Sequence, residues 1–71
     1  MNRLIKDRTV GEATIYLDEE DGLFEVTIER GMQNPEVVMT HIRESAATRA
    51  FFATVAKLRE EREQRGWVSN G

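Results

Sequence analysis

The chain lacks cysteine altogether and has only one proline, one histidine and five aromatic side chains among its 71 residues. Without cysteine there is no disulfide, and His41 alone is too few for a typical structural zinc site. A chain this short usually needs a disulfide, a bound metal, very regular packing or association with another chain, because one small core contributes only a few kcal/mol to the stability of the fold. We therefore expect a single domain over residues 1–71 that is packed very regularly or associates with another chain.

Long apolar runs are also missing. The N-terminal segment has two consecutive apolar residues, Leu4 and Ile5, whereas a signal peptide needs about 7 to 15 and a membrane span about 20. The sequence therefore predicts no membrane partner and a cytoplasmic location. A composition of 39% hydrophobic and 32% charged residues is typical of a folded globular domain and disfavours a disordered chain.

The net charge of −3 is unevenly distributed along the chain. Residues 1–11 and residues 37–71 each carry +2, whereas residues 12–36 contain eight acids against Arg30 alone and carry −7. A concentrated acidic segment attracts basic surfaces and repels the phosphates of nucleic acids. This distribution favours a basic partner for the middle of the chain.

Two stretches of alternating apolar and polar residues, 12–17 and 23–30, flank a run of four acids and Gly22. This pattern is typical of a β-hairpin, which we predict over residues 12–30. A one-residue slip would mix the two faces, so we choose a register that gathers the apolar side chains on one face. The predicted pairs are Leu17 with Phe24, Ile15 with Val26, and Ala13 with Ile28, and a third, edge strand could include Leu4, Ile5 and Val10.

Signals for a helix follow the hairpin. Asn34 suits the N-cap, Pro35 the first helical position and Glu36 the positive end of the helix dipole. Gly66 is typical of a helix end, with Trp67 placed to fold back on the last turn. We therefore predict a long or kinked helical segment over residues 34–66.

The apolar residues of that segment fall into two stripes that differ in direction by about 165° on a helical wheel. Either the helix breaks near Ser45, or one long helix packs its two halves on different surfaces. The hairpin can cover one stripe, and an exposed second stripe would be unusual in a monomer. We therefore predict an α+β homodimer with a two-fold interface. The predicted interface residues are Ala47, Phe51, Phe52, Val55 and Leu58.

No group of residues has the pattern of a catalytic or metal site. His41 and Ser45 are four residues apart but have no acid placed to orient the histidine. The acids of residues 18–21 lack the alternating spacing and distal glutamate of a calcium loop. The sequence therefore predicts a protein that is not an enzyme and holds no metal or cofactor.

Protein binding is the function that the sequence favours. We expect an inhibitor or regulator that docks its acidic hairpin on a basic surface of a larger protein, for example one that handles nucleic acid. The predicted binding residues are Glu12, Tyr16, Asp18, Glu19, Glu20, Asp21 and Glu25. Two alternatives stay open: a structural assembly subunit, and a homodimeric nucleic-acid-binding regulator that uses the basic residues of the helical segment (Arg43, Arg49, Lys57, Arg59, Arg62 and Arg65).

Overall fold

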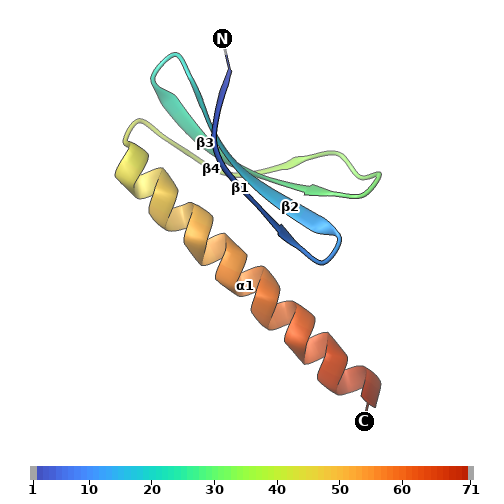
Figure 1. The fold of residues 1–71 in the computed structure, drawn as a ribbon. Coiled ribbons are helices and arrows are strands. Elements are labelled where there is room, and N and C mark those ends of the chain that lie inside the picture. The colour runs from blue at the N-terminus through green and yellow to red at the C-terminus, as the bar shows by residue number, and fades with distance from the viewer. Residues whose placement is uncertain (1, 71) are drawn as a thin grey trace.

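The computed structural model describes residues 2–70, with side chains through Gln64. An antiparallel sheet with strands in chain order is followed by one helix: β1 (Arg3–Val10), β2 (Ala13–Glu20), β3 (Leu23–Arg30), β4 (Glu36–His41) and α1 (Glu44–Asn70). The helix runs along one face of the twisted sheet and leaves the other face uncovered (Figure 1). The predicted α+β class is confirmed, but the sheet has four strands where we predicted two or three.

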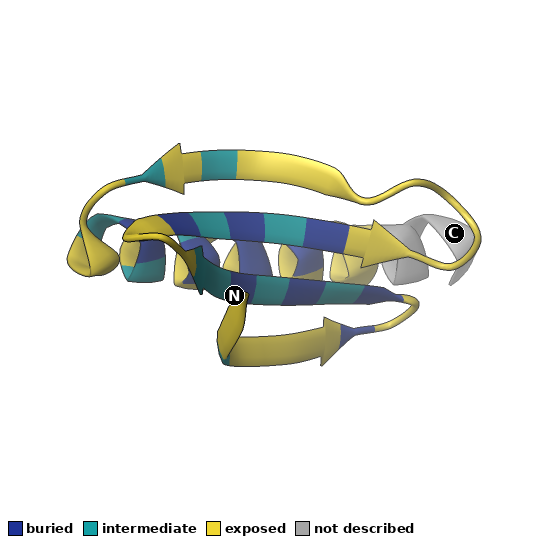
Figure 2. Cartoon of the chain, turned by 90° about the horizontal axis from the view of Figure 1, so that it is seen from above, coloured by how far each residue is buried: buried dark blue, intermediate teal, exposed yellow. Residues whose placement is uncertain are grey.

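The core lies between the helix and the two central strands. Alternating residues of β2 and β3 point toward α1, and Ile15, Leu17 and Val26 are fully buried there. Figure 2 shows this alternation as dark blue and teal bands on the central strands, whereas the edge strands β1 and β4 are mostly exposed. The helix contributes its own buried stripe to the same cluster, made of Ala47, Phe51, Val55 and Leu58.

The register of the β2–β3 hairpin differs by two residues from our prediction. Leu17 lies opposite Val26, and Ile15 lies opposite Ile28. A shift of two keeps every side chain on its face, so the alternation of the sequence cannot distinguish the two registers. The turn decides between them, because Asp21 and Gly22 have φ values of 54° and 81° and form a two-residue loop. Two positive φ values are what a type I′ turn requires, and this turn matches the twist of the flanking strands.

Replacing Gly22 by alanine tests this turn. We expect L-alanine to lower the free energy of unfolding by about 1–2 kcal/mol relative to D-alanine at the same position, because a left-handed conformation strains an L residue. A Cβ at this position would contact no atom within 4 Å, so the backbone alone sets the cost. Chemical synthesis supplies both variants and urea unfolding compares them. Equal stabilities would rule out the positive φ.

The predicted helix over residues 34–66 is wrong in its first part, because residues 36–41 form strand β4. Val37, Val38 and Thr40 are β-branched, which favours a strand over a helix. The helix begins at Glu44, close to the break that we considered near Ser45. The two stripes disagreed in direction because three of the four residues of the first, Val38, Met39 and Ile42, lie before the helix begins.

The stripe that we predicted to form a dimer interface is covered by the sheet of the same chain. Phe51 is fully buried and Val55 is 4% exposed, whereas Phe52 is 46% exposed. Because the first stripe lies mostly outside the helix, the apolar face of the hairpin has only this second stripe to cover, and Val10 of β1 adds to that face. The helix continues to Asn70, past the end that we predicted at Gly66, and the predicted packing of Trp67 lies outside the described side chains.

Candidate functional site

The uncovered face of the sheet, here called the open face, is the candidate site. Strand pairing places rows of side chains across it, such as Asp7, Tyr16 and Thr27 on neighbouring strands. The open face comprises the side chains that alternate with the buried ones: Leu4, Asp7, Thr9, Thr14, Tyr16, Asp18, Glu20, Leu23, Glu25, Thr27, Glu29, Val37 and Thr40.

The charge of the open face has a single sign. Five of its side chains are carboxylates, contributed by β1, β2 and β3, and no lysine or arginine among the strand residues that the structure describes projects from it. Charges of one sign on the surface of a low-dielectric protein reinforce one another and create a potential of several kT. The open face therefore attracts cationic groups. Its carboxylates are Asp7, Asp18, Glu20, Glu25 and Glu29.

Tyr16 lies at the centre of the open face. Its ring is half-buried, and Asp7 on β1 and Thr27 on β3 lie opposite it. The hydroxyl of Thr27 donates a hydrogen bond to an Oε1 atom of Glu25 at 3.3 Å, which orients that carboxylate. A tyrosine combines a large apolar ring with a polar end, and such side chains are frequent anchors of protein interfaces.

A shallow depression of about 420 Å³ lies at the end of the open face next to the β2–β3 turn. Leu23 supplies an apolar wall, and Asp18, Glu20 and Glu25 supply carboxylates. The depression also includes Asn2 and Asp21. Lysine and arginine bury their aliphatic stems against apolar surface and keep the charged end among polar groups. The chemistry of this depression suits such a side chain.

The structure brings most of the predicted binding residues together. Tyr16, Asp18, Glu20 and Glu25 share the open face, and Asp21 lines the depression at its end. Two others lie elsewhere. Glu19 projects to the helix side of the sheet, where a carboxylate oxygen lies 2.6 Å from an Nη2 atom of Arg3. Glu12 lies in the turn between β1 and β2, at the far end of the hairpin.

Two carboxylates of the open face were missing from the predicted set. Glu29 continues the alternation of Glu25 and Thr27 along β3, so the pattern of the sequence could have included it. Asp7 reaches the open face only because β1 joins the sheet, with Asp7 opposite Tyr16. The charged run Lys6-Asp7-Arg8 interrupts the apolar pattern of that strand, so the pattern of the sequence assigned no face to Asp7.

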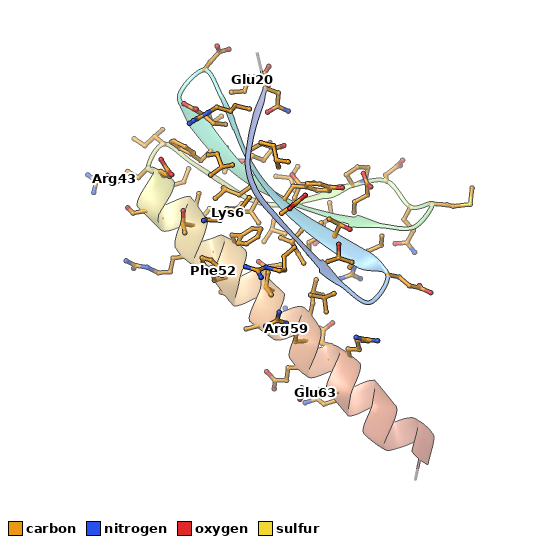
Figure 3. The ribbon with its side chains drawn as sticks, viewed as in Figure 1. Lys6, Glu20, Arg43, Phe52, Arg59 and Glu63 are labelled. Carbon is orange, nitrogen blue, oxygen red and sulfur yellow. The ribbon has the colours of Figure 1, made fainter. Side chains whose placement is uncertain are left out.

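A second charged surface lies between β1 and the helix. Lys6 and Arg8 lie opposite Leu17 and Ile15 and therefore project on the helix side of the sheet. We call the cations Lys6, Arg8, Arg59 and Arg62 the basic flank, and Figure 3 shows Lys6, Phe52 and Arg59 along it, with Glu63 farther down the helix.

Two contacts show how α1 lies against β1 and the β1–β2 turn along the basic flank. The Nζ atom of Lys6 lies 5.8 Å from the centroid of the Phe52 ring, within the range of a cation–π contact. The side chain of Arg62 lies over the β1–β2 turn, where a Cβ on Gly11 would be 3.4 Å from its Cδ atom. The molecule therefore carries carboxylates on the open face and cations on the basic flank.

His41 and Ser45 do not share a helical face. His41 ends β4, and its Nδ1 atom accepts a hydrogen bond from the backbone N–H of Arg43 at 2.9 Å. Ser45 lies in the first turn of α1 and is exposed. Among the described residues, no group of three or more histidine or acidic side chains is arranged to hold a metal ion.

Comparison of the chain with protein-family models, with curated proteins and with solved structures found no match. In the described part of the chain, α1 falls short of the length and apolar character that a membrane-spanning helix requires. The open face and the basic flank are therefore the two candidate functional surfaces of the protein.

Proposed function

We propose that the protein is a small non-enzymatic binding module, an inhibitor or regulator, that docks its open face on a basic surface of a larger protein. The observation that supports this most is the single sign of the open face, with five carboxylates around Tyr16. Leu4 and Leu23 are 55% and 43% exposed at the same face and add apolar contact area. The aromatic and apolar side chains anchor the partner, and the carboxylates select it by charge.

The size of the open face indicates what kind of complex it forms. Four strands spaced about 4.8 Å apart and about eight residues long give a flat footprint on the order of 400 Å². A standard interface uses roughly 800 Å² on each partner. A small, charged face favours rapid, salt-dependent association of modest affinity, because electrostatic steering raises the association rate more than it slows dissociation.

Neutralising the open face tests the proposal. We expect Asp18→Asn, Glu20→Gln and Glu25→Gln together to weaken binding at least about tenfold, because each change removes a charge and keeps the shape of the side chain. Proteins captured from host extract by the wild type and by this variant are compared by mass spectrometry, and the affinity of each recovered partner is then measured with purified proteins.

The matched control changes the same number of charges on the helix: Glu44→Gln, Glu60→Gln and Glu61→Gln. All of these side chains are exposed and lie on α1. Partners of the open face are retained by the control and lost by the open-face variant. Equal losses with both variants would mean that net charge, and not the open face, governs capture. Affinity that is insensitive to salt between low and physiological ionic strength would also contradict electrostatic docking.

The basic flank favours a second candidate function, the binding of single-stranded nucleic acid. The Nζ atom of Lys6 lies over the exposed Phe52 ring, Arg59 lies farther along the same helix, and cations beside an exposed aromatic ring are typical of such sites. We expect a labelled oligonucleotide to shift in a gel with the wild type and to lose the shift with Arg59→Glu and Arg62→Glu together. The matched control is Arg43→Glu with Arg49→Glu. No shift with the wild type at low salt would remove this candidate.

A further inference from the structure

The two edges of the sheet differ in how they are protected. Strand β1 has charged residues at four of its eight positions, and charged side chains along an edge are a device by which natural sheets prevent edge pairing. Strand β4 has one carboxylate, Glu36, and its two valines, Val37 and Val38, are 55% and 39% exposed. Of the two edges, β4 is the one open to pairing.

The outer edge of β4 has backbone groups without a strand partner. In the part of the chain that the structure describes, β4 is the last strand of the sheet and pairs on one side only, with β3. Exposed N–H and C=O groups along such an edge form a template for a further strand. An apolar, β-branched segment is well suited to supply that strand.

We propose that β4 pairs antiparallel with β4 of a second copy of this chain, about a two-fold axis perpendicular to the sheet. Glu36 then lies opposite His41 of the other copy, Val37 opposite Thr40, and Val38 opposite Met39. The two four-stranded sheets then form one continuous sheet of eight strands. This axis keeps both open faces on the same side and both helices on the other.

The irregular pairing within β4 makes this register consistent. Val38 has no partner on β3, because Val26 pairs with Met39 and the next residue, Thr27, pairs with Val37. The extra residue shifts the alternation between the two halves of β4. Pairing with β3 therefore places Glu36, Met39 and His41 on the helix side and Val37 and Thr40 on the open face. In the proposed register, Glu36 meets His41 on the helix side and Val37 meets Thr40 on the open face, so these pairs face the same side.

Charge complementarity favours a second copy as the partner of β4. Antiparallel pairing brings the acidic start of the strand, Glu36, next to its end at His41 and the exposed Arg43, and the two-fold axis repeats this contact. The Nδ1 atom of His41 accepts a hydrogen bond from the backbone of Arg43. A neutral ring then carries its proton on Nε2, which can donate to the carboxylate of Glu36 of the other copy.

Repulsion between the two acidic open faces does not oppose the pairing. On β4 the open-face side chains are Val37 and Thr40, which carry no charge. The nearest acids, Glu25 and Glu29, lie on β3, so their counterparts across the axis are about 14 Å away, or three strand spacings. At physiological ionic strength the screening length is about 8 Å, which weakens this repulsion strongly.

Disulfide trapping tests the register. Because the chain has no cysteine, the variants Val37→Cys and Thr40→Cys each contain a single thiol. We expect a mixture of the two to form a covalent dimer under mild oxidation, and far more of it than either variant alone. Identical positions lie about 10 Å apart along the strands, whereas a disulfide needs Cβ atoms about 3.8 Å apart. The control pair, Asp7→Cys with Thr9→Cys on β1, forms no such excess.

Sedimentation equilibrium tests the association itself. We expect a reversible dimer of the wild type, and a dissociation constant raised at least tenfold by Val37→Lys with Thr40→Lys, which sets like charges opposite each other. The control, Thr9→Lys with Thr14→Lys, adds the same charge to the open face far from β4 and stays dimeric. Circular dichroism verifies that each variant is folded. A wild type that is monomeric at millimolar concentration, or a dimer insensitive to the β4 lysines, would overturn the proposal.

Discussion

Replacing Phe51 by alanine is expected to lower the free energy of unfolding by about 3–5 kcal/mol, the usual cost of truncating a buried aromatic side chain. Phe51 is fully buried in the cluster between α1 and the central strands. A protein of this length has a total stability of only about 4–10 kcal/mol. The variant therefore loses a large part of its stability, which urea unfolding followed by circular dichroism measures.

Phe52→Ala is the matched control for this prediction. The two rings are in contact, with centroids 5.2 Å apart and an interplanar angle of 82°, but Phe52 is 46% exposed. We expect Phe52→Ala to cost no more than about 1 kcal/mol, mainly through the lost edge-to-face and cation–π contacts. Similar losses of stability for the two variants would contradict the finding that Phe51 is buried and Phe52 is not. A loss of stability in Phe51→Ala that varies with protein concentration would also contradict it, because Phe51 packs within one chain.

Leu17→Ala is expected to cost about 2–5 kcal/mol, because it leaves a cavity in the buried cluster on the helix side of β2. Leu17 is fully buried and lies opposite Val26. Its control has the same chemistry: Leu23→Ala removes the same atoms from the open face, where Leu23 is 43% exposed. We expect that change to cost less than about 1 kcal/mol. Comparable losses would show that both faces of the sheet are covered.

The central hairpin could be predicted from the sequence, and its turn shows why its register was missed. Alternation identified the strands and the buried face, since both depend only on a period of two. The four acids before Gly22 made a long loop plausible. A two-residue loop at Asp21 and Gly22 extends β2 by residues that carry charge, such as Glu19 and Glu20, whereas β3 begins at Leu23 as predicted.

Strand β4 was missed because the signals for a helix start are local. Asn34, Pro35 and Glu36 are in the correct order for a cap, and the segment after them has no breaker before the true helix. The β-branched residues Val37, Val38 and Thr40 were the opposing signal. The disagreement of the two apolar stripes was the second signal, and it is resolved when the helix begins at Glu44.

The candidate site could be predicted where it depended on the hairpin alone. Tyr16 and Glu25 share the open face in both the predicted and the observed register, because a shift of two preserves the faces. Asp18, which we predicted to lie in the turn, joins the face because β2 extends to Glu20.

Residues beyond the hairpin depended on tertiary structure. Asp7 required β1. Glu19 leaves the face because β2 extends to Glu20, so that Glu19 continues the alternation of Ile15 and Leu17 on the helix side.

An isotope-filtered NOE experiment on a mixture of labelled and unlabelled protein tests the fold behind all of these proposals most directly. Contacts between the Phe51 ring and the methyl groups of Ile15, Leu17 and Val26, which share one buried cluster, are expected only within a chain. Strand-type contacts between Val26 and Met39 are expected as well. Contacts of the Phe51 ring that arise between chains, or helical contacts over residues 36–41, would contradict a helix that packs on its own sheet.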